Sequence, residues 1–222
     1  MTGDIVQYWS RLKDHDTTHP DDRVVFDRLD GAHGFDLRCL PSCFFGPIAT
    51  APVVVLYLSP GLKEDIDHRQ AASPEGRAWY RETRAGRALL PHEHENEAGW
   101  RWWVTRTGCF GKPKDVQPHI ALLNLSGYHS RTFADWPLLS ALPSCRATLS
   151  WAHNVLFPDA IAEKRIVICL RSPRYWGLYS GFSEGSLYAP EATRSGHMIK
   201  SALRDEIIEK VKRSIKRAQL AR

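Results

Sequence analysis

The segment VVVLYLSPGL, residues 53–62, joins a continuous apolar run to an abrupt polar stop. Three β-branched valines begin the run, and Ser59, Pro60 and Gly61 follow it. A short, continuously apolar and β-branched run is typical of a strand covered on both faces, as the strands of parallel sheets are. In such sheets, ligands bind beyond the carboxyl ends of the strands. The polar stop therefore lies where we expect a functional site.

Three further apolar runs end in polar residues and alternate with helical stretches. They are HIALLNLSGY (119–128), KRIVICLRSP (164–173) and GSLYAPEATRS (185–195). Strands that alternate with helices predict an α/β fold, in which helices cover both faces of a parallel sheet. We therefore expect a three-layer α/β/α architecture around a central, mostly parallel, four-stranded sheet.

Hydrophobic spacing predicts the helices. The C-terminal segment from Ser201 has the clearest pattern, because Leu203, Ile207, Val211 and Ile215 step by four residues. Further helices are expected at 4–12, at 20–31, within 75–104 and at 138–156 with an interruption near Pro143. The segment FDLRCL (35–40) is expected to form a short strand, followed by a loop.

The length and composition are those of one globular domain. The 222 residues are 43% hydrophobic and 25% charged, which is enough to bury a substantial core in a single domain, residues 1–222. No apolar stretch approaches the roughly 18 residues of a membrane span, and the charged N-terminus does not resemble a signal peptide. We therefore expect a cytoplasmic protein without a membrane partner.

The net charge of +5 and the sequence pI near 9.0 favour an anionic partner, of which nucleic acid is the commonest. Eight Trp and seven Tyr residues suit stacking on bases, and they suit core packing equally well. Charge and aromatic content together favour nucleic-acid binding without excluding other functions.

The cysteines and histidines give no clear metal motif. Five cysteines without a secretion signal predict reduced, structural thiols. Cys39 and Cys43 are spaced C-x3-C, a loose match to a metal or iron–sulfur site. His92 and His94 in HEHENE (92–97) lack an evident third ligand for zinc. We expect no metal and no cofactor.

The order of several short motifs resembles that of the uracil-DNA glycosylase superfamily, in particular its mismatch-specific and thymine-DNA glycosylase branches. Tyr57 to Leu62, YLSPGL, is similar to the first motif of these branches, G-I-N-P-G-L. ALLN (121–124) is similar to the Leu-Leu-Leu-Asn strand end of the uracil-specific branch, and RWW (101–103) resembles Arg-Phe-Trp of the mismatch branch. RIVICLRSPRYWG (165–177) and GSLYAPEATRSGHM (185–198) occupy the places of the late strand and the last motif.

The resemblance implies a uracil-DNA glycosylase-like fold and a monofunctional DNA glycosylase that acts as a monomer on double- or single-stranded DNA. Such an enzyme flips a base out of the stack and hydrolyses its N-glycosidic bond, leaving an abasic site. The biological setting would be base excision in DNA repair or antiviral defence against modified foreign or phage DNA. Relatives have Asp or Asn where this chain has Ser59, and the last motif is rewritten. A modified base is therefore the expected substrate, rather than plain uracil.

The resemblance also implies catalytic roles. Ser59 would hydrogen-bond the attacking water, although a serine hydroxyl is no base at neutral pH. Asp65 or Asp67 would supply the missing acceptor, or would simply begin a solvated helix. His197 would donate to the departing base oxygen, or would be a surface or capping histidine.

Base and phosphate contacts follow from the same comparison. Asn124 would pair with the base edge, or would cap the strand end. Trp102 would stack on the base and Phe45 would border the pocket, or both would pack in the core. The expected phosphate contacts, each with a solvated surface charge as the alternative, are Arg171, Arg174, Arg194 and Lys200.

Two other functions stay open. A catalytically inactive DNA-binding module of the same fold would have lost the group that activates water. A nucleotide-acting α/β hydrolase would share the fold class alone.

Overall fold

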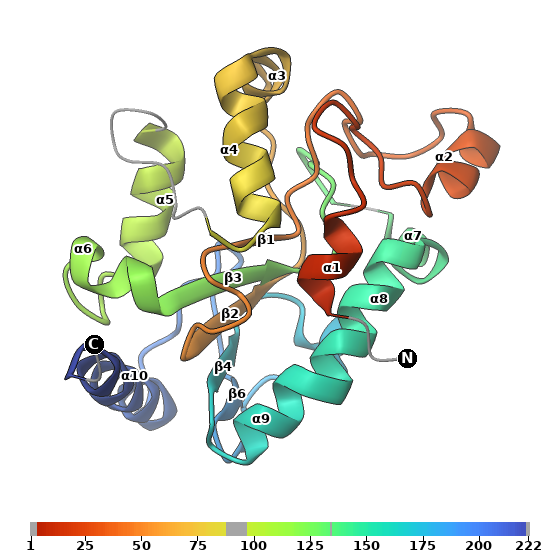
Figure 1. The fold of residues 1–222 in the computed structure, drawn as a ribbon. Coiled ribbons are helices and arrows are strands. Elements are labelled where there is room, and N and C mark those ends of the chain that lie inside the picture. The colour runs from red at the N-terminus through yellow and green to blue at the C-terminus, as the bar shows by residue number, and fades with distance from the viewer. Residues whose placement is uncertain (1–3, 88–96, 134, 221–222) are drawn as a thin grey trace. The chain divides into compact units, whose positions relative to one another are not determined.

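The computed structural model describes residues 4–87, 97–133 and 135–220. The chain forms two compact units that are interleaved along the sequence (Figure 1). The first unit comprises Met1–Phe44, Leu58–Ala88 and Asn124–Val155, and the second comprises Phe45–Tyr57, Leu89–Leu123 and Leu156–Arg222. The chain therefore passes from one unit to the other directly after the strand at 53–57.

The sheet has six strands in the order β1-β3-β2-β4-β6-β5. The strands are β1 Phe44–Phe45, β2 Val53–Tyr57, β3 Ile120–Asn124, β4 Ile166–Cys169, β5 Phe182–Glu184 and β6 Leu187–Ala189. β2 pairs with β4 and β4 with β6 in parallel, whereas β5 pairs with β6 antiparallel. The α/β class is confirmed, and all four predicted strands form and are adjacent in the sheet. The prediction of a four-stranded sheet is not confirmed, because two short outer strands make a mixed sheet of six.

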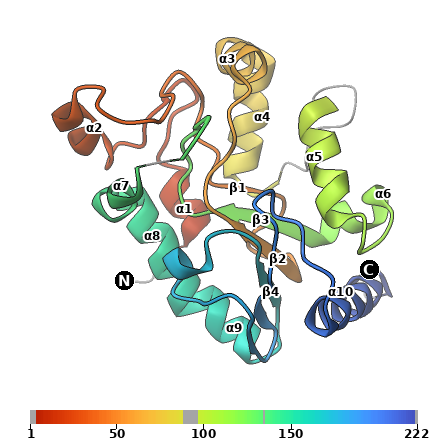
Figure 2. The ribbon, with the colours of Figure 1, turned by 180° about the vertical axis from the view of Figure 1, so that it is seen from behind.

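Both faces of the sheet are buried in the second unit. Val53, Val55 and Tyr57 lie in one apolar cluster with side chains of α5 (Glu97–Thr107) and α10 (Ala202–Leu220). Val54 and Leu56 point to the opposite face, since side chains alternate along a strand, and each is 0% exposed. The helix α9 (Phe157–Ile161) lies on the other side of β4 and β6 from α10 (Figures 1 and 2). The apolar run of β2 is therefore continuous because both faces of the strand are buried, as predicted from the sequence.

The apolar residues of the C-terminal segment are spaced by four because one face of the helix α10 is buried, as predicted. Ile207, Val211 and Ile215 on α10 are buried against the sheet, and Leu203 is partly buried there. The remaining short helices of the second unit are α6 (Pro113–Val116), η1 (Gln117–His119) and η3 (Pro173–Trp176).

The helices of the first unit match the predictions in part. They are α1 Ile5–Trp9, α2 Arg23–Leu29, α3 Glu64–Ala72, α4 Pro74–Arg84, α7 Trp136–Ala141 and α8 Pro143–Trp151. The interruption at Pro143 is confirmed, and a π-helical segment, Ala152–Leu156, extends α8. The strand predicted at 35–40 is wrong, because the Asp36 carboxylate accepts the backbone N–H of Arg38 at 3.0 Å and closes a turn.

All five cysteines are free thiols, and only Cys109 is not fully buried. Burial raises the pKa of the Cys43 thiol to about 12. Within the described ranges, no helix has both the length and the apolar character to cross a membrane. His92 and His94 lie outside the described residues.

Candidate nucleic-acid interface

The strand order identifies the edge of the sheet where a ligand is expected. The segment after β2 leads to β3 on one side, whereas the segment after β4 leads to the β5–β6 pair on the other. The two strands are parallel, so their carboxyl ends lie at one edge, and ligands bind where neighbouring connections diverge in this way. Tyr57 ends β2, and Arg171 follows the end of β4 by two residues.

A small hairpin of residues 192–198 packs on these two side chains. Ala192 and Met198 form an antiparallel bridge, and the Gly196 N–H donates to the Thr193 carbonyl at 2.9 Å. Gly196 has a φ of +83°, and a Cβ placed on it would lie 2.9 Å from Tyr57 Cε1 and 3.7 Å from Arg171 Cγ. The hairpin therefore needs glycine at this position to approach Tyr57 so closely.

The helix α5 supplies an aromatic ring and a further cation. The Trp102 and Tyr57 ring centroids are 5.1 Å apart, and the Arg106 guanidinium lies 4.7 Å from the centroid of the Trp102 ring. Arg106 Nε and Nη2 donate to the Ser195 carbonyl at 3.1 and 2.9 Å. These hydrogen bonds connect α5 to Ser195 in the hairpin.

Arg106, Arg171 and Arg194 form what we name the arginine cluster. Burial lowers the pKa of Arg106, and the positive charge of Arg171 lowers it further. Burial likewise lowers the pKa of Arg171, with a second contribution from the charge of Arg194. No acidic side chain of the described ranges forms an ion pair with any of the three. Arg106 and Arg171 are partly withdrawn from water, whereas Arg194 is exposed. Neighbouring like charges gain stability from an anion, and guanidinium groups suit phosphate oxygens.

The structure brings four predicted residues of the second unit together with two that the sequence did not indicate. Trp102 and Arg171 lie beside Tyr57, while Arg194 and His197 belong to the hairpin. The His197 backbone closes the hairpin turn, and its imidazole makes no hydrogen bond with the described residues. Tyr57 and Arg106 were not predicted. Arg106 follows Trp102 by four residues on a helix, and this spacing places both on one face. The spacing could therefore have indicated Arg106 from the sequence.

The structure gives other surroundings to the three remaining predicted residues of this unit. Phe45 packs against the apolar core beside the sheet. Arg174 is exposed on η3, where its guanidinium lies 4.8 Å from the centroid of the Tyr175 ring. Lys200 is exposed just after the hairpin. Their predicted contacts with base and phosphate stay predictions.

The loops after β2 and β3 run side by side in the first unit. The Leu58 carbonyl accepts the Ser126 N–H at 2.8 Å, and Nδ1 of His129 lies 2.8 Å from the Gly61 carbonyl oxygen. Asn124 is 5% exposed, and its Nδ2 donates to the Ser42 carbonyl at 2.9 Å. Asn124 therefore secures a neighbouring segment, and its side-chain oxygen keeps its capacity to accept a hydrogen bond.

The acids after Ser59 are placed in ways that the sequence did not distinguish. Asp65 is exposed in the first turn of α3. Asp67 is 8% exposed, accepts the Lys63 N–H at 2.6 Å and lies 3.5 Å from Nδ1 of His129. A carboxylate in this position stabilises the start of a helix. Neither acid hydrogen-bonds the Ser59 hydroxyl, which has no hydrogen-bond partner among the described residues.

Gly196 and Gly181 provide a matched pair for testing the packing of the hairpin. Gly181 has a φ of +90°, and nothing lies within 4 Å of a Cβ placed on it. Alanine should therefore cost about 1–2 kcal/mol at Gly181, through backbone strain alone. Gly196→Ala should lower stability further and weaken nucleic-acid binding, because its methyl group displaces the hairpin from Tyr57. Chemical denaturation and a binding titration of both variants check this, and equal effects in the two variants contradict it.

Comparison with known proteins adds no assignment: no family model, no curated protein and no solved structure matches the chain. The resemblance to the uracil-DNA glycosylase superfamily therefore rests on the motifs quoted from the sequence.

Proposed function

We propose that the chain is a DNA glycosylase with a uracil-DNA glycosylase-like fold, which removes a modified base and leaves an abasic site. The observation that carries this proposal is the arginine cluster around Tyr57 and Trp102 at the carboxyl ends of β2 and β4. It combines the two kinds of group that a flipped nucleotide requires, cations for phosphate and, in the partly exposed Trp102, an aromatic ring for the base.

The chemistry assigned by the resemblance is hydrolysis. Water adds its oxygen to C1′ while the bond from C1′ to the base nitrogen breaks, and the departing base takes up a proton. Ser59 would hydrogen-bond this water, Asn124 would accept a hydrogen bond from the base edge, and His197 would donate to the departing base. The free acceptor of Asn124 and the unpaired imidazole of His197 are compatible with these roles.

The experiment uses single- and double-stranded oligonucleotides that each carry one modified base from a panel. With protein in excess over the oligonucleotide, mass spectrometry of the released base and strand cleavage at abasic sites measure the rate of a single round of base release. We expect one or more modified bases to be released, and Asn124→Ala to slow the release. The control is Arg213→Gln, which removes an exposed charge from α10 and should leave the rate unchanged.

An inactive DNA-binding module is the second candidate. It is favoured by the placement of the acids, since Asp67 is engaged by Lys63 and Asp65 is exposed without contacting Ser59. This candidate predicts oligonucleotide binding that depends on the arginine cluster, with no base released from any member of the panel. That outcome would overturn the glycosylase proposal and retain the binding site.

A further inference from the structure

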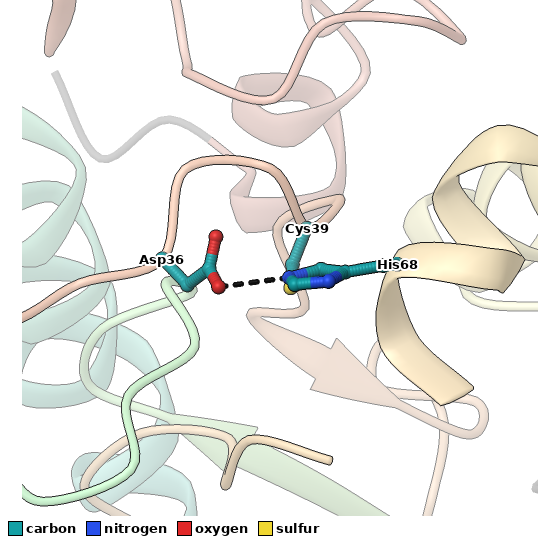
Figure 3. Close-up of side chains that lie close together, drawn as sticks. All are labelled: Asp36, Cys39 and His68. Carbon is teal, nitrogen blue, oxygen red and sulfur yellow. Dashed lines mark hydrogen bonds and ion pairs between the residues drawn. The ribbon is translucent and has the colours of Figure 1, made fainter. Parts of the chain in front are cut away.

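Three side chains of different ligand types converge in the first unit. Asp36 and Cys39 come from the turn at 36–39, and His68 comes from α3 (Figure 3). A carboxylate oxygen, the thiol sulfur and an imidazole nitrogen all lie within 4.8 Å of one another. Oxygen, sulfur and nitrogen atoms are the ligand types that zinc accepts in proteins.

The backbone brings these residues together. The Arg38 N–H donates to the Asp36 carboxylate at 3.0 Å, and the Cys39 N–H donates to the Asp36 carbonyl at 3.4 Å. The Asp36 N–H in turn donates to the His129 carbonyl at 2.8 Å, which ties the turn to the loop after β3. The ligand atoms are therefore held by the fold rather than by flexible side chains alone.

The surroundings of Asp36 fit a metal-binding carboxylate. Arg38 Nε and Nη2 donate to its two oxygens at 2.9 and 2.7 Å, and these hydrogen bonds hold the pKa of Asp36 well below its usual value. Ligating carboxylates are commonly hydrogen-bonded in this way by a second partner. The positive charge of Arg38 opposes a divalent cation, but its side chain is 71% exposed, so water and salt screen that repulsion.

We propose that Asp36, Cys39 and His68 bind a zinc ion, with solvent in the fourth coordination position. His68 Nε2 lies 2.8 Å from Asp36 Oδ2, and this hydrogen bond is replaced by two bonds to the metal. The Cys39 thiol releases its proton to solvent, and the His68 proton resides on Nδ1. Cys39 is 2% exposed, the Asp36 side chain is 9% exposed and the His68 side chain is 28% exposed, so the open position faces solvent on the side of His68. Three protein ligands with an open fourth position are typical of reactive rather than purely structural zinc sites.

The proposal does not rest on the proposed glycosylase function, and cobalt substitution tests it without any activity assay. Co²⁺ is added to the reduced protein under inert gas, and absorption is recorded in the near-ultraviolet and visible regions. We expect a thiolate-to-cobalt charge-transfer band that saturates at about one equivalent and disappears when Zn²⁺ displaces the cobalt.

Variants identify the ligands. Cys39→Ser should abolish the charge-transfer band, and His68→Gln should weaken binding by more than the roughly 10- to 100-fold typical of losing an outer-shell partner. Cys109→Ser and His15→Gln, which change a half-buried thiol and an exposed imidazole outside the cluster, should bind as the parent protein does. Circular dichroism establishes that each variant is folded, and half-buried His68 can be replaced without opening a core cavity.

Three results would overturn the proposal. The parent protein could give no charge-transfer band, which would leave Asp36 and His68 as a hydrogen-bonded pair only. The band could persist in folded Cys39→Ser, which would assign the thiolate to another cysteine. His68→Gln could bind Co²⁺ as tightly as the parent does, which would remove the imidazole from the site.

Discussion

Replacing Arg171 with glutamine is expected to weaken nucleic-acid binding about 10- to 100-fold. Its guanidinium makes no hydrogen bond or ion pair with described residues and lies beside Arg194 at the end of β4. A hydrogen bond to a charged group contributes about 1.5–3 kcal/mol, which corresponds to that range of affinity. On duplex DNA, the loss of one phosphate contact should also reduce the slope of log K against log salt by about 0.9.

Fluorescence anisotropy of a labelled oligonucleotide over a series of salt concentrations measures both quantities. Arg213→Gln is the matched control, because it removes the same charge from the exposed face of α10, where Arg213 forms no ion pair with a described residue. Its affinity should stay within about twofold of the parent, as expected for a screened surface charge. Equal weakening in the two variants would indicate that net charge alone binds the nucleic acid.

Replacing Trp103 with alanine is expected to remove a large part of the stability of the fold. Trp103 is 0% exposed within the apolar cluster between α5 and the sheet, and large-to-small changes of this kind cost about 3–5 kcal/mol. The total stability of a domain is typically about 5–15 kcal/mol. Trp103 Nε1 has no hydrogen-bond partner, so the loss comes from packing alone.

The neighbouring tryptophan should behave differently. Trp102 is only partly buried and contacts Tyr57 and Arg106. Trp102→Ala should lower stability less than Trp103→Ala and should weaken single-stranded DNA binding by about 1–3 kcal/mol, the usual contribution of stacking one base. Guanidinium denaturation and the anisotropy titration separate the two effects. If Trp102→Ala destabilises as strongly as Trp103→Ala while sparing DNA binding, Trp102 is a core residue.

The inner strands could be predicted because each is a continuous apolar run, as burial on both faces requires. β5 gives no such signal: Phe182 is partly buried while Ser183 and Glu184 are exposed, and the strand exists because a two-residue turn at Gly185 folds it onto β6. β5 is therefore held in the sheet by pairing with β6 rather than by burial, so its sequence can be polar.

The helix α3 illustrates a second limit. Its sequence EDIDHRQAA has no apolar stripe, so hydrophobic spacing cannot reveal it. It begins with acids in its first turn, and one of them, Asp67, bonds the Lys63 N–H. Local hydrogen bonding also explains why the strand predicted at 35–40 is wrong, because the Asp36 side chain closes a turn there.

The candidate site was predictable in its location more than in its residues. The polar ends of the strands indicated the edge of the sheet at which the candidate site lies, and the resemblance named Trp102, Arg171 and Arg194. Tyr57 was hidden in the apolar run, although it ends β2 beside Arg171. The engagement of Asp67 by Lys63 could not be predicted, because it depends on the path of a loop.

The central claim is that Trp102 and the hairpin at 192–198 contact the base of a bound nucleic acid. Photo-crosslinking tests it most directly: an oligonucleotide carrying 5-iodouracil is irradiated on the protein, and the modified peptides are identified by mass spectrometry. We predict crosslinks to Trp102 or His197, and their loss in Arg171→Gln at moderate salt. Crosslinks confined to the basic face of α10 would contradict the claim.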